Sequence, residues 1–517
     1  MAGSSHKAES FFGYIAEEAY DSAGRPSEAQ DVANNINYAI GPCANGISSS
    51  GVCYAPNGSV AQVQNGANLV STYIYNKRFQ PCWMYGTTGT PLATNTTCTA
   101  GDPGPGNILD LQYNFNLGAG DNGNVVGITN KRDSTRTQSF TYDQLNRIVQ
   151  AQTSSTSGSN WGETYTIDEW GNLTAIGVVS GYTGCTQENL SVSATTNNQL
   201  SATGFSYDTS GNMLNDGAHA YAYNAESEIK SAAGVNYTYD GDGNRIEKSS
   251  GKIYWYGAGT EILDESDTSG NITNEYVFFG GKRIAMRNVS SGTIYYYEED
   301  MLGSSRTMVQ AGQTSVCYDG DFYPFGGERI ITNTCAQNYK FEGKERDTET
   351  GNDDFGARYY TSRLGRWLSA DWSAVPAPVP YANLANPQTL NLYAMVSDNP
   401  ETFADLDGHS RGISLNGDAE ISCSNVFALP GEGFPPPQNN GTGTPNSTTQ
   451  QAQQQSDQQN QAQQQNSCGF FCRLFHTDHA PYQLVINPEK LSFGWTKFRG
   501  AGQLSPGCTP EIPSDNF

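Results

Sequence analysis

Two cysteines and two histidines near the C-terminal end form the most compact group of residues whose types could do chemistry. They are Cys468, Cys472, His476 and His479, with Cys508 beyond them. Thiolates and imidazoles bind zinc tetrahedrally, and such a metal stabilises small modules. The spacing matches no standard zinc finger well, so a Cys468–Cys472 disulfide or plain apolar packing explains these residues better. We therefore expect no metal ion and no other cofactor.

The same histidines suggest a second chemistry, because either one could act as the general acid or base of a nuclease. The pattern His476-x-Asp-His479 is too common to predict such an activity. Nucleic-acid binding is also not indicated, because the basic residues of this segment are balanced by acidic ones. These residues are Lys490, Lys497 and Arg499 against Asp478, Glu489, Glu511 and Asp515. The sequence leaves the activity of the segment open.

The elements that must position any site are indicated by an internal repeat. A copy contains, in this order, an aromatic residue, any residue, a Tyr or Ile, and an Asp or Asn, which is Gly257 in the last copy. A turn and an aliphatic residue follow. Tyr207, Tyr223 and Tyr239 lie sixteen residues apart in consecutive copies. The copies begin at Phe140, Tyr165, Phe205, Tyr221, Tyr237 and Tyr254, with weaker copies around Tyr20 and Tyr113.

Each copy predicts a β-hairpin. Strand side chains alternate between faces, so the two aromatic positions share one face, and the Asp and Gly-Asn residues reverse the chain. One hairpin is marginally stable, so successive hairpins must join into a continuous sheet. We predict an all-β fold in which stacked hairpins form a wound sheet, a partial cocoon or shell. A generic β-solenoid or propeller also fits the period. The stretch 82–106 is expected to be a loop.

Composition excludes several classes of function. The 517 residues include 28 Lys and Arg against 52 Asp and Glu, a net charge of −24. This charge argues against the shell binding a nucleic-acid backbone or an anionic membrane as a whole. No apolar run is long enough for a membrane helix, and we see no signal peptide. The cysteine pairs 43/53, 82/98 and 317/335 could close loops in an oxidising compartment.

The repeats resemble the Tyr-Asp repeats of the Rhs (rearrangement hotspot) family, which includes bacterial Rhs toxins and the C component of insecticidal toxin complexes. The block 276–409 makes the resemblance specific, because it follows the repeat-associated core of the family segment by segment. Its motifs include Gly343-Lys-Glu-Arg-Asp347 and Ala357-Arg-Tyr-Tyr360. The matching segments are 276–284, 295–306, 318–326, 339–351, 355–360, 364–371, 391–394 and 399–409.

The resemblance implies a hollow, strand-lined shell whose core block cuts the chain. In the family, two aspartates and one arginine cleave after a short Asp-Pro-x-Gly-Leu sequence. The matching residues are Arg358, Asp371 and Asp405, and the scissile bond joins His409 to Ser410. Two neighbouring carboxylates share a proton, so one serves as base and the other as acid, while an arginine holds a carboxylate in place. The ordinary alternative for both aspartates is a turn residue that caps its own backbone.

The chain departs from the family pattern around this bond. Leu406 stands where the family has Pro, His409 where it has Leu, and Trp372 where Pro is common. We expect these residues to change how the substrate loop is held.

The resemblance and the composition together divide the chain into five parts. The Gln-rich stretch 449–466 buries little apolar surface, and about fifty residues beyond it rarely form a stable core without staples. The parts are a divergent repeat region (1–130), the repeats (131–275), the self-cleaving core that caps the shell (276–409), a Pro/Gly-rich then Gln-rich linker (410–466), and a small variable segment (467–517) that fits a toxin remnant.

The leading functional hypothesis is a bacterial toxin shell that encloses its own C-terminal segment as cargo and releases it by autoproteolysis, against competing bacteria or a host. An immunity protein and a secretion machinery are the implied partners, and a secreted or cell-surface location is expected. One alternative is a non-catalytic surface protein whose aromatic repeats bind carbohydrate or a partner. Another is an inactive C-terminal fragment of a larger protein of the family.

Overall fold

The computed structural model describes residues 5–412 except 8–15, 22, 33, 41–51, 101–103, 105, 118–121, 157–159, 183–186, 258, 373–386 and 410, and also 482–487 and 492–497. The chain forms two units, residues 1–446 and 447–517. In the smaller unit, the described strands β38 (Tyr482–Asn487) and β39 (Ser492–Lys497) pair as an antiparallel hairpin.

The larger unit begins with an antiparallel sheet of fifteen strands. Each strand pairs with its neighbour in the sequence, except that β4 pairs with β6 and β5 adds to β6 at the side. The strands are β1 (Ser5–Lys7), β2 (Ala16–Tyr20), β3 (Pro26–Asp31), β4 (Ile36–Ile40), β5 (Cys53–Tyr54), β6 (Val60–Asn65), β7 (Leu69–Tyr75), β8 (Pro81–Thr87), β9 (Leu109–Asn114), β10 (Gly127–Asn130), β11 (Gln138–Tyr142), β12 (Ile148–Thr153), β13 (Gly162–Ile167), β14 (Leu173–Val178) and β15 (Leu190–Ser191).

Two short hairpins and a sheet of twelve strands continue this arrangement, again with sequence neighbours paired. The hairpins are β16 (Ser193–Ala194) with β17 (Leu200–Ser201), and β18 (Phe205–Tyr207) with β19 (Met213–Asp216). The sheet contains β20 (Tyr221–Tyr223), β21 (Ile229–Ala232), β22 (Val235–Tyr239), β23 (Arg245–Lys248), β24 (Lys252–Tyr256), β25 (Ile262–Ser266), β26 (Ile272–Phe279), β27 (Lys282–Asn288), β28 (Thr293–Glu299), β29 (Ser305–Gln310), β30 (Val316–Phe322) and β31 (Glu328–Asn333).

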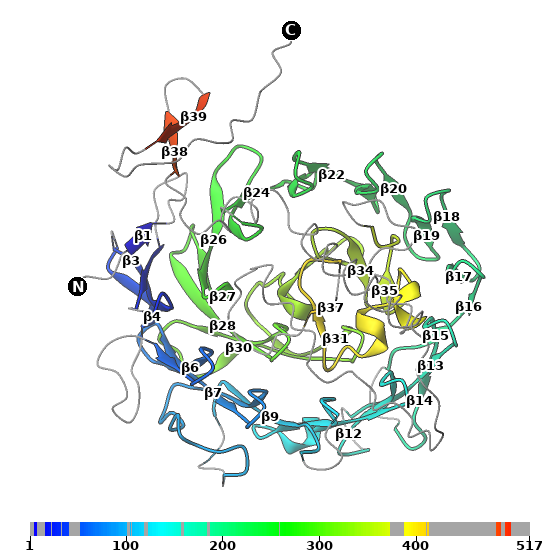
Figure 1. Ribbon diagram of the computed structural model, residues 1–517, viewed down its shortest axis with the longest axis horizontal. Helices are drawn as coiled ribbons and strands as arrows, with labels where there is room; N and C mark the ends of the chain where they lie inside the picture. Colours follow the sequence, from blue (N-terminus) through cyan, green and yellow to red (C-terminus); the bar gives the residue numbers. More distant parts are fainter. Residues whose placement is uncertain are drawn as a thin grey trace, which may run out of the picture. The chain divides into compact units, whose positions relative to one another are not determined.

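These strands follow one another around a wall, and the later strands of the same unit, among them β34, β35 and β37, lie within it (Figure 1). The fifteen-stranded sheet also packs on the twelve-stranded sheet. Ala39 on β4 and Ala285 on β27 are fully buried in one apolar cluster, which also takes in Val277 and Val309. The predicted all-β, wound arrangement of hairpins is confirmed.

The repeat residues have two distinct roles in building the wall. The Asp caps its own turn, as where Asp143 accepts hydrogen bonds from the backbone N–H groups of Leu145 (2.8 Å) and Arg147 (3.0 Å). The same contacts recur at Asp21, Asp168, Asp208, Asn224, Asp240 and Asp267. The second Tyr joins hairpins, since the Tyr142 hydroxyl donates to the Val125 carbonyl at 2.6 Å. The repeat thus supplies both turn and cross-link.

The inner segment has little regular structure and many contacts with the wall. The Tyr393 hydroxyl donates to the Gly211 carbonyl (2.9 Å), and the Asn391 amide donates to that of Gly171 (2.9 Å). Its strands are β32 (Glu345–Arg346), β33 (Asp353–Asp354), β34 (Tyr359–Thr361), β35 (Arg366–Trp367), β36 (Ala404–Asp405) and β37 (Arg411–Gly412). The described 3-10 turns of the chain are η1 (Ser134–Arg136), η2 (Phe341–Gly343), η3 (Pro387–Leu390) and η4 (Val396–Asp398).

The cysteine and loop predictions have mixed outcomes. Disulfides join Cys82 to Cys98 and Cys317 to Cys335, as expected, whereas Cys43 lies outside the described residues. The expectation of a loop over 82–106 is wrong at its start. Pro81–Thr87 forms the buried strand β8, because its apolar side chains, including the fully buried Trp83, pack into the core.

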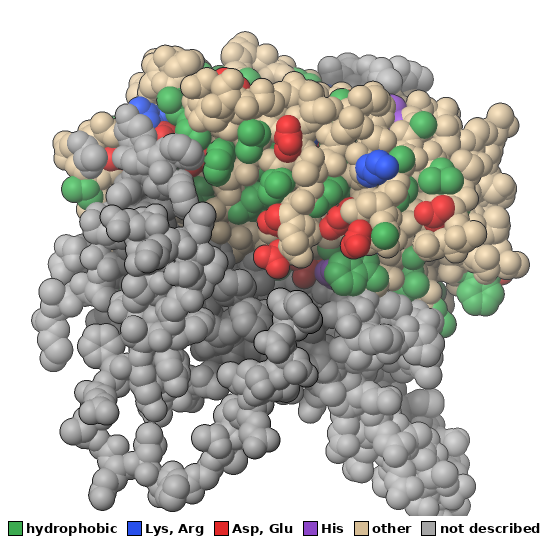
Figure 2. All heavy atoms as spheres, turned by 90° about the horizontal axis from the view of Figure 1, so that it is seen from above, with side chains coloured by type: hydrophobic (Ala, Val, Ile, Leu, Met, Phe, Trp, Pro, Cys, Tyr) green, Lys and Arg blue, Asp and Glu red, His purple; other side chains and the backbone are tan. Residues whose placement is uncertain are grey.

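Acidic side chains are more frequent than basic ones on the described face drawn in Figure 2, in keeping with the net charge of −24. In the described part of the chain, no helix is long and apolar enough to cross a membrane.

Candidate functional site

The three residues matched to the family's cleavage chemistry lie together. Arg358 directly precedes β34, Asp371 follows β35, and Asp405 ends β36. One guanidinium nitrogen of Arg358 (Nη2) is 3.4 Å from Asp371 Oδ2 and 3.6 Å from Asp405 Oδ2. Strands β34 and β35 are paired, which brings Arg358 and Asp371 to one end of a small sheet. The structure therefore places two carboxylates around one cation.

Arg358 is held rigidly between these carboxylates. Its guanidinium lies over the Trp367 ring at 4.2 Å, and Nη1 donates to the Leu392 carbonyl at 3.0 Å. Its Nε donates to the Gly408 carbonyl. Gly408 has a φ of +83°, and a Cβ there would lie 3.0 Å from the Arg358 backbone nitrogen. Only glycine therefore fits this close approach of the loop.

Asp405 is buried and holds a proton unusually well. Burial raises its pKa to about 7; Arg358 opposes this shift, while the charges of Asp407 and Asp371 add to it. Its Oδ1 also accepts hydrogen bonds from the backbone N–H groups of Gly408 (2.7 Å) and Asp407 (3.3 Å). Asp405 thus caps a turn, as the ordinary alternative predicted, while lying beside Arg358.

Asp371 contacts two residues at which the chain departs from the family pattern. Its Oδ1 accepts a hydrogen bond from the Trp372 backbone N–H (2.9 Å) and lies 3.1 Å from His409 Nδ1. The Trp372 and His409 rings meet edge to face, with centroids 4.5 Å apart. The residue before the expected scissile bond is therefore anchored on one of the two carboxylates.

The expected scissile bond lies between strands β36 and β37 in the chain. Strand β36 pairs with β37, and Asp405 is opposite Arg411. Ser410 lies outside the described residues, as do Cys468, Cys472, His476 and His479, so the cleavage position and the weak metal candidates remain predictions. The described residues contain no group of three or more His, Cys, Asp or Glu side chains suited to a metal ion.

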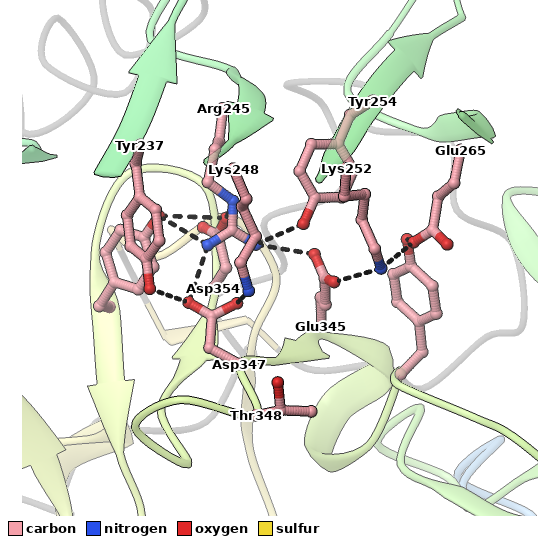
Figure 3. A network of polar contacts seen from close by, with 12 residues as sticks. Tyr237, Arg245, Lys248, Lys252, Tyr254, Glu265, Glu345, Asp347, Thr348 and Asp354 are labelled. Atoms are coloured by element: carbon pink, nitrogen blue, oxygen red, sulfur yellow. Dashed lines mark hydrogen bonds and ion pairs between the residues drawn. The ribbon is translucent and has the colours of Figure 1, made fainter. Parts of the chain in front are cut away.

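Sequence reasoning missed a charged network that joins the wall to the inner segment (Figure 3). Arg245 on β23 is 2.7 Å from Glu345 and 2.8 Å from Asp347. Lys248 and Lys252 add contacts of 2.9 Å to Asp347 and Glu345. Although burial opposes it, Lys252 and Arg245 hold the pKa of Glu345 below its ordinary value. The only sequence feature connected with this network was the run Gly343-Lys-Glu-Arg-Asp347, which belongs to the motifs of the family resemblance.

Two further residues, Glu342 and Lys344, also went unassigned from the sequence. Their side chains contact the backbone of Asp405 and Leu406. Both belong to a stretch that served only as a mark of the family resemblance.

Comparison with known proteins gives relatives among toxins. No family model matches the chain. The tRNA nuclease WapA of Bacillus subtilis is 29% identical over 270 residues, which are 49% of this chain and 11% of WapA. The toxin subunit YenC1 of Yersinia entomophaga is 34% identical over 130 residues, 24% of this chain and 12% of that protein.

A solved structure shares the fold. The Photorhabdus luminescens Tc holotoxin pore matches with a TM-score of 0.59 and 21% identity, covering 81% of this chain and 21% of that chain. In the sequence comparison, the chain spans only about a tenth of the length of the WapA nucleases that it matches.

Proposed function

Since the chain is a relative of the Rhs-type toxins, we propose that it is the shell of such a toxin and that it cuts its own backbone between His409 and Ser410. The observation that carries this proposal is the meeting of Arg358, Asp371 and Asp405 around the loop that leads to His409. The released segment would act on a competing bacterium or a host. An immunity protein and a dedicated export machinery belong to the same proposal.

The proposed reaction is a single hydrolysis that needs no cofactor. A water molecule attacks the carbonyl carbon of His409, and Asp371 takes the proton that this water loses. Asp405, protonated because of its burial, gives its proton to the nitrogen of Ser410 as the peptide bond breaks. The products are a carboxyl group on His409 and an amine on Ser410. Arg358 keeps the two carboxylates and the Gly408 carbonyl in fixed positions.

Replacing Asp405 with asparagine is expected to leave the chain whole. Asparagine keeps the turn but has no proton of suitable acidity to donate. Intact mass spectrometry of the purified wild-type chain should give two pieces, residues 1–409 and 410–517, and the Asp405→Asn chain should give one. Asp407→Asn makes the same chemical change two residues away and should still be cut. A folded wild-type chain that stays whole would refute the proposal.

Self-cleavage should slow as the pH rises above neutrality. The pKa of Asp405 is about 7, so its proton-donating form dominates below that pH and is depleted above it. The rate should therefore fall about tenfold per pH unit above about pH 7. Following fragment 410–517 on gels after synthesis of fresh chain, in buffers from about pH 6 to about pH 9, measures this rate. A rate that increases across that range would contradict the role of Asp405 as the acid.

A further inference from the structure

Two charged side chains, Glu342 and Lys344, bind the backbone of the segment that leads to His409. Glu342 Oε2 accepts a hydrogen bond from the Asp405 backbone N–H at 2.8 Å, and Lys344 Nζ donates to the Leu406 carbonyl at 2.6 Å. We propose that Glu342 and Lys344 are positioning residues that fix the register of residues 405–409 against Arg358 and Asp371. This inference rests on the self-cleavage proposed above and names residues outside its three-residue site.

The three contacts to this segment involve three different backbone groups within four residues. Glu342 holds the N–H of residue 405, Lys344 the carbonyl of residue 406, and Arg358 the carbonyl of residue 408. A segment held at three points cannot slide by one residue without losing all of them. Such a slip would carry the scissile bond away from the carboxylates, and hydrolysis depends on that placement.

Glu342 and Lys344 form a clamp on residues 405–409, and the wall holds the loop that carries this clamp in place. Glu342 has a left-handed backbone conformation (φ 48°, ψ 31°) within η2, which is strained for a residue other than glycine. Its N–H donates to Ser304 Oγ (3.0 Å), and the Ser305 N–H donates to the Lys340 carbonyl (3.0 Å). Ser304 lies in the turn between β28 and β29, and Ser305 begins β29. The strain therefore persists because a hairpin of the wall holds the loop in place.

The electrostatics of Glu342 are costly for a merely structural residue. Its side chain is buried, and its Oε1 has no hydrogen-bond partner among the described residues. Burial and then the charge of Asp405 raise its pKa well above the ordinary value. Burial likewise lowers the pKa of Lys344, although Glu342 and Asp405 oppose this. A buried carboxyl group with an unpaired oxygen adds little to stability. We therefore attribute the burial of Glu342 to its hydrogen bond with the backbone of the segment to be cleaved.

Four variants of the full chain test the clamp through the rate of self-cleavage. Glu342→Gln keeps an acceptor for the Asp405 N–H and should cleave within about threefold of wild type. Glu342→Ala and Lys344→Met each lose one hydrogen bond to the backbone of residues 405–409 and should cleave about 10- to 100-fold more slowly. Glu328→Gln is the matched control, because Glu328 pairs with Lys340 in the same loop without contacting residues 405–409, and should cleave normally. Equal rates in all four variants would overturn the inference.

A second measurement separates failure of the clamp from failure of the protease. In an Asp405→Asn chain, which retains the backbone N–H of residue 405, hydrogen exchange of a peptide covering residues 403–409 reports the clamp without cleavage. Adding Glu342→Ala should speed exchange in that peptide by about tenfold or more, and adding Glu342→Gln should not. Unchanged exchange would refute the clamp even if cleavage occurs. Faster exchange in a chain that never cleaves would retain the clamp and reject the protease.

Discussion

Replacing Arg245 with methionine is expected to lower the free energy of unfolding by about 3–5 kcal/mol, the usual cost of removing one partner of a buried ion pair. Arg245 is only 3% exposed, and its guanidinium contacts Glu345, Asp347 and Asp354 at 2.7 to 3.2 Å. Three carboxylates would remain in the interior with less compensating charge. The inner segment, which carries Arg358, would also lose its main anchor on β23.

Urea unfolding followed by circular dichroism measures this loss through the shift of the transition midpoint. Arg25→Met is the matched control, because Arg25 also pairs with an aspartate, Asp21, but is 40% exposed in its side chain. Exposed pairs contribute at most about 1 kcal/mol, so the control should unfold almost as wild type does. Equal midpoints for the two variants would show that the buried network does not hold the inner segment to the wall.

The repeat hairpins could be predicted from the sequence because their information is local. In each copy an Asp or Asn caps backbone groups two and four residues ahead, as Asp240 does for Asp242 and Asn244. The pattern is visible in one short window and repeats, so it specifies the turn wherever it occurs. Strand β8 escaped prediction because its Gly, Thr and Cys content resembles a loop, and its burial is set by contacts with other strands.

The site was only partly predictable for the opposite reason. Arg358, Asp371 and Asp405 came from the family resemblance, and nothing in their spacing would have placed them around one another. Arg245 meets Asp347 across about a hundred residues of chain, and such pairing depends on how the inner segment folds against the wall. Glu342 gave no signal at all, because its role arises from a left-handed turn that sequence patterns favour for glycine.

Replacing Arg358 with lysine is expected to slow self-cleavage on the order of 10³-fold, as when a preorganised donor is removed from an active site. One ammonium group cannot reproduce the fork that contacts Asp371, Asp405 and the Gly408 carbonyl together. The rate is measured from the appearance of fragment 410–517 in freshly synthesised chain. Arg363→Lys, at a half-exposed arginine that pairs with Asp216, is the control and should cleave normally.

The pH dependence of a neutral Arg358 variant gives a sharper reading of the same residue. Arg358 lowers the pKa of Asp405, against the effect of burial, so its removal lets that pKa rise above about 7. In Arg358→Met, the fall in rate at alkaline pH should therefore begin at a higher pH than in the wild-type chain, although the rate itself is lower throughout. If the arginine had only a structural role, its removal would lower the rate but would not change the pH at which the rate begins to fall. If the rate of Arg358→Met begins to fall at the same pH as in the wild-type chain, or at a lower pH, then Asp405 does not donate the proton. Arg358 would then serve only to hold the loop.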